Sequence, residues 1–223
     1  MLSQAGSKTV RTRWVICNKS DDACPDIRAR LVACELNTFS TDEYFASTPP
    51  LEAKRMLLSE FATRRHCADG RPLEISFVDV RKAYFNGIPK RDLFLFVPKE
   101  MGLGAKALAH LRRCVYGTRD AGQIWEEVYA ATLIRLGFRR GIANPCCFYH
   151  DEKQISVVVH GDDLTALGGR SELEWYEAGL REAFEIKVKG HLGEAEVCAE
   201  VVRNCGSCHK HFAVLRVKKN GDQ

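Results

Sequence analysis

Two adjacent aspartates, Asp162 and Asp163, interrupt an apolar part of the chain, in the stretch SVVVHGDDLTALG at residues 156–168. Neighbouring carboxylates repel each other, and desolvating them is costly. Most aspartate pairs in turns only hydrogen-bond the nearby backbone. Here the turn lies inside an apolar hairpin, and a third aspartate, Asp79, ends the apolar segment LEISFVDV at 73–80. This pattern favours a chemical role over a plain turn.

Three carboxylates gathered from strand ends are oxygen ligands of the kind that hard divalent cations prefer. Two such ions, about 3.5–4 Å apart, can clamp an in-line displacement at phosphorus. One ion lowers the pKa of the attacking hydroxyl, and the other neutralises charge on the leaving pyrophosphate. The sequence therefore predicts two Mg²⁺ ions, with Mn²⁺ able to substitute, at Asp79, Asp162 and Asp163.

The elements that position these residues are expected to form an α+β fold with an antiparallel sheet flanked by helices. Apolar periodicity predicts helices after Pro49, over 119–137, and after Ser171, where Glu174 completes a capping box. The last helix is expected to bury Leu173, Tyr176, Leu180 and Phe184. Alternating and apolar runs predict strands at 10–18, 27–34, 73–80, 92–98, 146–150, 155–160 and 164–169.

Composition narrows the class of protein. The chain has 223 residues, 45% of them hydrophobic, which suits one large domain or two small ones. Its net charge of +4 is compatible with nucleic-acid binding without being diagnostic. No apolar run approaches the roughly 18 residues of a membrane span, and no signal peptide is visible. We therefore expect an intracellular protein with no membrane partner and with its ten cysteines reduced.

The chain resembles the reverse transcriptase domain of copia-type LTR-retrotransposon polyproteins. Its motifs follow the family's order: RWVICNKSDDACPDIRARLVACE (13–35), SFVDVRKAYFNG (76–87), CVYGTRDAGQIWEEVY (114–129), VVVHGDDLTALG (157–168) and FEIKVKGHLGE (184–194). The resemblance implies fingers and palm over 11–194, with the thumb largely missing. It also implies an RNA-directed DNA polymerase that extends a primer on an RNA or DNA template with dNTPs, in the cytoplasm, a virus-like particle or the nucleus.

The resemblance assigns roles residue by residue. Asp79, Asp162 and Asp163 match the catalytic, metal-binding aspartates, and Val80 would offer its backbone carbonyl to a metal. Tyr84 matches the steric gate that excludes a ribose 2′-hydroxyl, although a plain core aromatic is the alternative. The remaining matches are Phe85 packed behind Tyr84, Arg28 and Arg30 on the triphosphate, Asp120 or Gln123 at the base or template, and His160 and Gly161 at the primer.

The chain departs from the family pattern at several places. The box reads H-G-D-D where the family has Y-V-D-D, and Asp120 replaces the usual Gln. A carboxylate at position 120 would repel a triphosphate. Residues 1–10 are expected to be disordered. Residues 195–223 diverge from the family, so we expect a fragment of a Gag-Pol polyprotein whose other parts would be its partners.

The simplest interpretation of the divergent tail is an unstructured segment with incidental cysteines, and a metal site is the alternative. Its cysteine and histidine ligands, with Cys198 upstream, would be of the kind that Zn²⁺ takes: Cys205, Cys208, His209 and His211. Its C-x-x-C-H spacing also matches c-type haem attachment, which would need an export signal. Two alternatives to an active polymerase therefore stay open. One is an inactive retrotransposon-derived fragment that keeps the fold or nucleic-acid binding, and the other is a small metal-binding protein that works through the tail.

Overall fold

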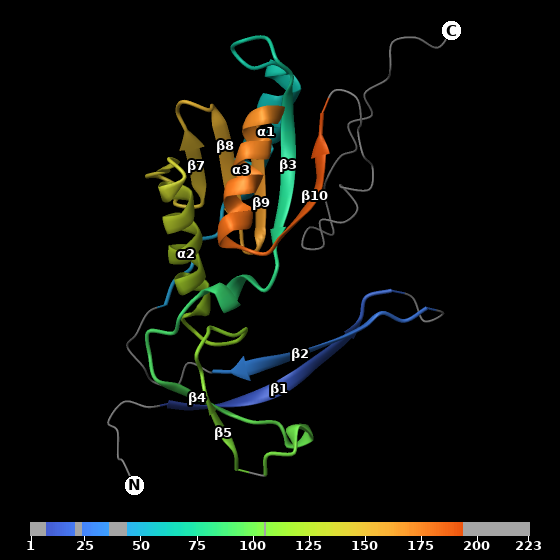
Figure 1. The fold of residues 1–223 in the computed structure, drawn as a ribbon, viewed down its shortest axis with the longest axis vertical. Helices are drawn as coiled ribbons and strands as arrows, with labels where there is room; N and C mark the ends of the chain where they lie inside the picture. The colour runs from blue at the N-terminus through green and yellow to red at the C-terminus, as the bar shows by residue number, and fades with distance from the viewer. Residues whose placement is uncertain (1–7, 21–23, 36–43, 105, 194–223) are drawn as a thin grey trace.

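The computed structural model describes residues 8–20, 24–35, 44–104 and 106–193, which form two β-sheets with helices packed mainly on one of them (Figure 1). The four-stranded sheet has the order β2-β1-β4-β5, with β1 (Lys8–Asn18), β2 (Ile27–Cys34), β4 (Leu93–Phe96) and β5 (Leu108–His110). The six-stranded sheet has the order β10-β3-β9-β8-β7-β6, with β3 (Leu73–Val80), β6 (Arg139–Arg140), β7 (Cys147–His150), β8 (Ile155–His160), β9 (Asp163–Gly169) and β10 (Ile186–Leu192). The helices are α1 (Leu51–Arg64), α2 (Ala121–Arg135), α3 (Arg170–Ala183) and the 3₁₀ turns η1 (Ala83–Asn86) and η2 (Lys99–Met101).

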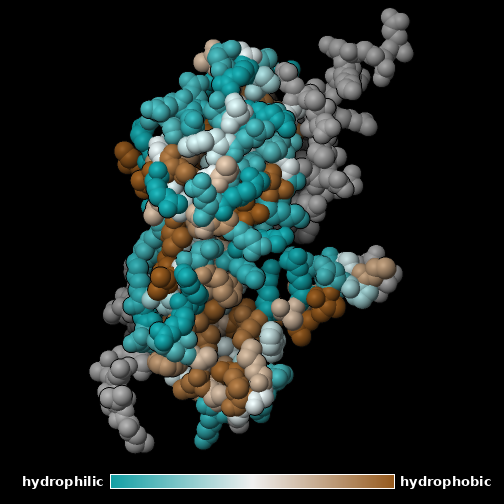
Figure 2. Space-filling model, in the orientation of Figure 1, coloured by the Kyte–Doolittle hydropathy of each residue, from teal (hydrophilic) through white to brown (hydrophobic). Residues whose placement is uncertain are grey.

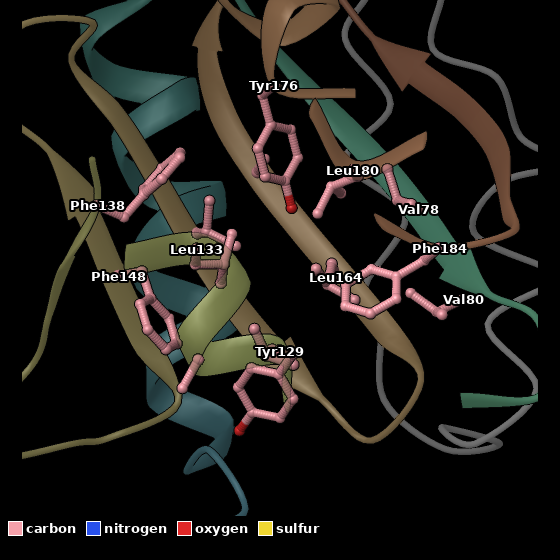
Figure 3. Packing of buried hydrophobic residues seen from close by; sticks show 14 of the residues in the cluster. Val78, Val80, Tyr129, Leu133, Phe138, Phe148, Leu164, Tyr176, Leu180 and Phe184 are labelled. Atoms are coloured by element: carbon pink, nitrogen blue, oxygen red, sulfur yellow. The ribbon is translucent and has the colours of Figure 1, made fainter. Parts of the chain in front are cut away.

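Helices cover both faces of the six-stranded sheet. Because side chains alternate along a strand, β3 sends Val78 and Val80 to one face and Leu73 and Ile75 to the other. The first pair joins the main core with α2 and α3, where Tyr176 and other aromatic and aliphatic side chains interdigitate (Figure 3). The second pair packs against α1. A sheet buried on both faces is held rigidly, so groups at the ends of its strands have fixed positions.

The four-stranded sheet has a much smaller core, made of Val10, Ala33, Leu93 and Leu95. Beyond that core, β1 and β2 continue as a two-stranded hairpin that projects from the molecule (Figure 1). Apolar surface gathers over this sheet and along the hairpin, whereas more of the six-stranded part is hydrophilic on the side shown in Figure 2. Ile16, for example, is 66% exposed. Much of the described part of the hairpin is therefore exposed.

Most expected elements are present, and the differences have physical causes. The strands lie in two sheets instead of one, and β1 pairs with β4 in parallel, so the expectation of an antiparallel sheet holds only for the six-stranded sheet. The predicted capping box is wrong, because α3 begins two residues early, at Arg170, and Gly169 occupies the N-cap in place of Ser171. The four apolar residues expected to be buried there are buried, three of them in α3 and Phe184 directly after its end. The short strands β5 and β6 and the edge strand β10 were not predicted.

Candidate functional site

The strand register brings two of the three predicted aspartates together. Asp79 at the end of β3 is paired with Asp163 at the start of β9. On the neighbouring strands, His160 of β8 is paired with Asp163, and Lys187 of β10 with Asp79. Directly paired residues of antiparallel strands share a face. A row of charged and polar side chains therefore crosses one end of the six-stranded sheet, on the face that carries α1.

Two hydrogen bonds fix the turn that carries the third aspartate. Gly161 has φ +64°, a left-handed conformation that glycine adopts without strain, and it opens the two-residue turn between β8 and β9. The Val80 backbone N–H donates to the Asp162 carbonyl oxygen at 2.8 Å. The Trp125 indole Nε1–H donates to the Gly161 carbonyl oxygen, also at 2.8 Å. The end of β3 and a buried residue of α2 thus hold Asp162 beside Asp79.

A lysine that the sequence argument did not single out lies between two of the carboxylates. The Lys189 Nζ is 3.0 Å from Asp79 Oδ1 and 2.7 Å from Asp163 Oδ1. Desolvation acts to lower the pKa of Lys189, but its hydrogen bonds to Asp163 and Asp79 outweigh this and leave the pKa raised. The ammonium group is therefore fully charged at neutral pH and neutralises part of the carboxylate cluster.

For the remaining carboxylate, Asp162, a backbone hydrogen bond and the charge of Lys189 compensate only in part. Desolvation by the surrounding protein, together with the negative charges of Asp163 and Asp79, raises the pKa of Asp162. A raised carboxyl pKa means that the folded protein disfavours the charged form. Additional positive charge placed near Asp162 would relieve this cost.

The donor chemistry of the site fits a hard divalent cation. All three side chains offer carboxylate oxygens, which Mg²⁺ and Mn²⁺ prefer. Within the described ranges, no three His, Cys, Asp or Glu side chains converge closely enough to hold a metal ion as they stand. Two of the carboxylates are instead bridged by the Lys189 ammonium, so a cation already occupies the position between them.

Two tyrosines lie beside the carboxylates. The Tyr84 ring from η1 meets the Tyr116 ring edge to face, with the centroids 4.8 Å apart. Burial and the charge of Asp162 raise the pKa of Tyr84, and the same two causes lead those that raise the pKa of Tyr116. Phe85 is 41% exposed, and its ring lies against Tyr116. Its expected packing behind Tyr84 stays a prediction. Tyr116 is a site residue that the sequence argument missed, although it lies in one of the quoted motifs.

The two predicted phosphate-binding arginines differ in position. The Arg30 guanidinium lies 5.8 Å from the centroid of the Tyr116 ring, so the β1–β2 hairpin reaches the candidate site at this residue. Arg28 is paired with Cys17, two residues farther toward the tip of the hairpin. Both arginines are exposed. The structure therefore brings Arg30 to the site and leaves Arg28 farther out.

His160 has an unexpected neighbour. The Lys54 Nζ from α1 lies 3.2 Å from the His160 Nδ1. Burial and the positive charge of Lys54 lower the pKa of His160. The histidine is therefore held neutral at pH 7, with its Nδ1 as the acceptor for the lysine.

Asp120 forms an ion pair with Arg91 inside the protein. Its side chain is buried at the start of α2, and Arg91 NH2 lies 2.8 Å from Asp120 Oδ1. The same guanidinium binds Glu35 at the end of β2, at 2.8 Å. Gln123 is half-buried in the first turn of α2. The expected contact of Asp120 or Gln123 with a nucleotide, like the carbonyl role of Val80, stays a prediction.

The tail ligands Cys198, Cys205, Cys208, His209 and His211 lie outside the described residues. The cysteines of the described ranges are free thiols. No helix in these ranges is long and apolar enough to cross a membrane.

A comparison of the sequence with known protein families gives a match over most of the chain. The family model described as "Reverse transcriptase (RNA-dependent DNA polymerase)" matches residues 3–209. The match continues past Glu194, where we expected the resemblance to end. It includes both sheets, all three helices and the three aspartates. Because it covers most of the 223 residues, the chain belongs to the reverse transcriptase (RNA-dependent DNA polymerase) family.

Proposed function

We propose that this chain forms the fingers and palm of a copia-type RNA-directed DNA polymerase and extends a primer with dNTPs. In this proposal the six-stranded sheet is the palm and the four-stranded sheet the fingers. The observation that carries it is the pairing of Asp79 with Asp163, with Asp162 hydrogen-bonded to Val80 beside them. Two acidic side chains from distant parts of the sequence are thus paired at one end of a rigid sheet, and the backbone of the third aspartate is fixed next to them.

The proposed catalytic residues are Asp79, Asp162 and Asp163, which would hold two divalent cations. When bound, these ions would lower the pKa of the primer 3′-hydroxyl and offset the charge of the leaving pyrophosphate. The raised pKa of Asp162 supports this assignment, because perturbed carboxyl groups cluster at functional sites. The chain's own contribution is to fix the three carboxylates through the β3–β9 register and the hydrogen bonds to the turn.

The neighbouring residues would bind the nucleotide. Tyr84, close enough to Asp162 for the carboxylate to affect its pKa, would lie under the deoxyribose as the steric gate. Tyr116 would support the Tyr84 ring from the side. Arg30, exposed and next to Tyr116, would offer a planar guanidinium to triphosphate oxygens. His160 and Gly161 would lie on the primer side of the site.

The test is primer extension on a homopolymer template with Mg²⁺, comparing the full chain with Asp162→Asn. We expect metal-dependent incorporation that falls at least about 1,000-fold in the variant, since the cations that Asp162 would help to hold stabilise transition-state charge by several kcal/mol. Asp151→Asn is a matched control, because Asp151 lies in the turn between β7 and β8 and pairs with Arg139. Folded wild-type protein without incorporation would reject the proposal and favour the inactive-fragment alternative.

A further inference from the structure

Strand β10 contains an irregularity opposite the carboxylates. Its register with β3 runs Lys187 to Asp79 and Val188 to Val78, then resumes with Gly190 opposite Phe77. Lys189 is the extra residue of a β-bulge at this point. Bulges are common beside active sites, where they redirect a side chain.

The bulge changes which side chains of β10 reach each face of the sheet. In a regular strand, positions 187, 189 and 191 would all point to the same face. Here the Lys189 ammonium reaches Asp79 and Asp163 on one face, whereas His191 reaches Glu177 of α3, with Nε2 2.7 Å from Oε1. Gly190 supplies the needed backbone with φ +147°, a region that side chains rarely adopt. The strand is therefore anchored to α3 on one side while it presents a cation on the other.

The three groups of this contact are similarly accessible. The side chains of Lys189, Asp79 and Asp163 are 28%, 28% and 22% exposed. A partly buried ion pair of this kind is screened less than a surface pair, and it can still open without unfolding the sheet. An ammonium group placed between two carboxylates satisfies the same charges that a divalent cation would satisfy.

We propose that Lys189 is a built-in counter-ion of the carboxylate site, which a divalent cation must displace in order to bind. This proposal rests on the proposed function, since it concerns the same metal site. Lys189 lowers the repulsion between carboxylates when metal is absent. It also lowers the apparent affinity for the cation, because binding requires the ion pair to open first. Metal entry is thereby coupled to the position of the Lys189 side chain.

The experiment measures Mn²⁺ binding to the full chain without nucleotide, by electron paramagnetic resonance of the free ion. We expect Lys189→Met to bind Mn²⁺ roughly tenfold more tightly than wild type, the size of change that loss of one competing charge near the site can produce. Lys99→Met is the control: it removes the same charge from the exposed turn η2, and within the described residues no ion pair joins Lys99 to either aspartate. We expect the control to change the affinity less than about threefold.

A second measurement uses the wild-type protein and does not depend on a variant that folds. In [¹⁵N]lysine-labelled protein, the Lys189 ammonium should give a slowly exchanging resonance in EDTA, identified by its absence in Lys189→Arg. Saturating Mg²⁺ should remove or shift it while the other lysine resonances stay in place. A resonance that is unchanged at saturating Mg²⁺ would overturn the proposal, and so would a Lys189→Met protein that binds Mn²⁺ no more tightly than wild type.

A further variant separates the two proposals. If wild type binds Mn²⁺ and Asp79→Asn does not, the metal site is present, and equal affinity of wild type and Lys189→Met then rejects only the counter-ion role. If neither wild type nor Lys189→Met binds Mn²⁺ at millimolar concentration, the metal site itself is absent, and both proposals fail.

Discussion

The two sheets of this protein differ in how deeply they are buried and in which candidate site residues they carry. The six-stranded sheet is covered on both faces and buries large side chains completely, including Leu133, Tyr176 and Leu180. The four-stranded sheet has a small core and extends an exposed hairpin. The acidic cluster lies on the first sheet and the candidate phosphate-binding arginines on the second. In the proposed function, the groups that must keep fixed distances thus lie on the rigid region, and the groups that would meet a substrate lie on the less supported one.

A buried network joins the two regions. Arg91 contacts Glu35 at the end of β2 and Asp120 at the start of α2. The Glu35 side chain is fully buried, and it also accepts hydrogen bonds from Lys8 and from the backbone N–H of Arg119. Desolvation acts to raise the pKa of Glu35, but these partners lower it to about 2. The relative position of the sheets therefore depends on one charged junction as well as on apolar packing.

The largest effect should come from the core of the six-stranded sheet. Leu180→Ala removes a fully buried side chain from a densely packed cluster and should lower the free energy of unfolding by about 3 kcal/mol. Urea denaturation measures this, and Arg181→Ala, next to it on α3 and 54% exposed, is the control. A loss below about 1 kcal/mol for Leu180→Ala would mean that the six-stranded region is not the rigid one.

The next-largest effect should come from the charged junction that Arg91 forms with Glu35 and Asp120. Arg91→Ala leaves buried Glu35 without its main partner and should cost about 2–3 kcal/mol, less than a fully buried pair because Arg91 is 23% exposed. Lys90→Ala removes an exposed pair with Glu127 and should change stability by less than about 0.5 kcal/mol. Equal effects of the two variants would show that the sheets are held together without the junction.

The same junction predicts a dependence on pH. The pKa of Glu35 is about 2 in the folded protein and 4.5 for an unperturbed glutamate, as in the unfolded chain, so its stabilisation is complete above pH 4.5 and disappears as the pH falls toward 2. Chemical denaturation between pH 6 and pH 3 should show wild type losing stability more steeply than Arg91→Ala. Parallel curves for the two proteins would contradict the role of Arg91 in keeping Glu35 ionised.

In the candidate site, Asp162 should lower the stability of the folded protein, although it is one of the proposed catalytic residues. Asp162 has a raised pKa, so its charged form weakens the folded state at neutral pH. Asp162→Asn should therefore raise the free energy of unfolding slightly, by less than about 1 kcal/mol since the turn is solvent-accessible. The gain should shrink as the pH falls and Asp162 of the wild type becomes protonated. Destabilisation by this variant would show that Asp162 supports the fold.

The smallest effect should be at the hairpin. Ile16→Ser changes a side chain that is 66% exposed and should alter stability by less than about 0.5 kcal/mol, as measured by thermal unfolding. A loss of 2 kcal/mol or more would mean that the hairpin is covered in solution, and the contrast between the two sheets would need revision.

The sequence alone determined the apolar elements and the identity of the acidic residues. The strand pattern of 73–80 put Asp79 at a strand end, and the apolar runs around Asp162 and Asp163 predicted their hairpin, because both features depend on local alternation. Only the tertiary structure decided what surrounds them. The β3–β9 register, the bulge that directs Lys189 and the pairing of Asp120 with Arg91 arise from contacts between distant segments, and local periodicity carries no information about such contacts.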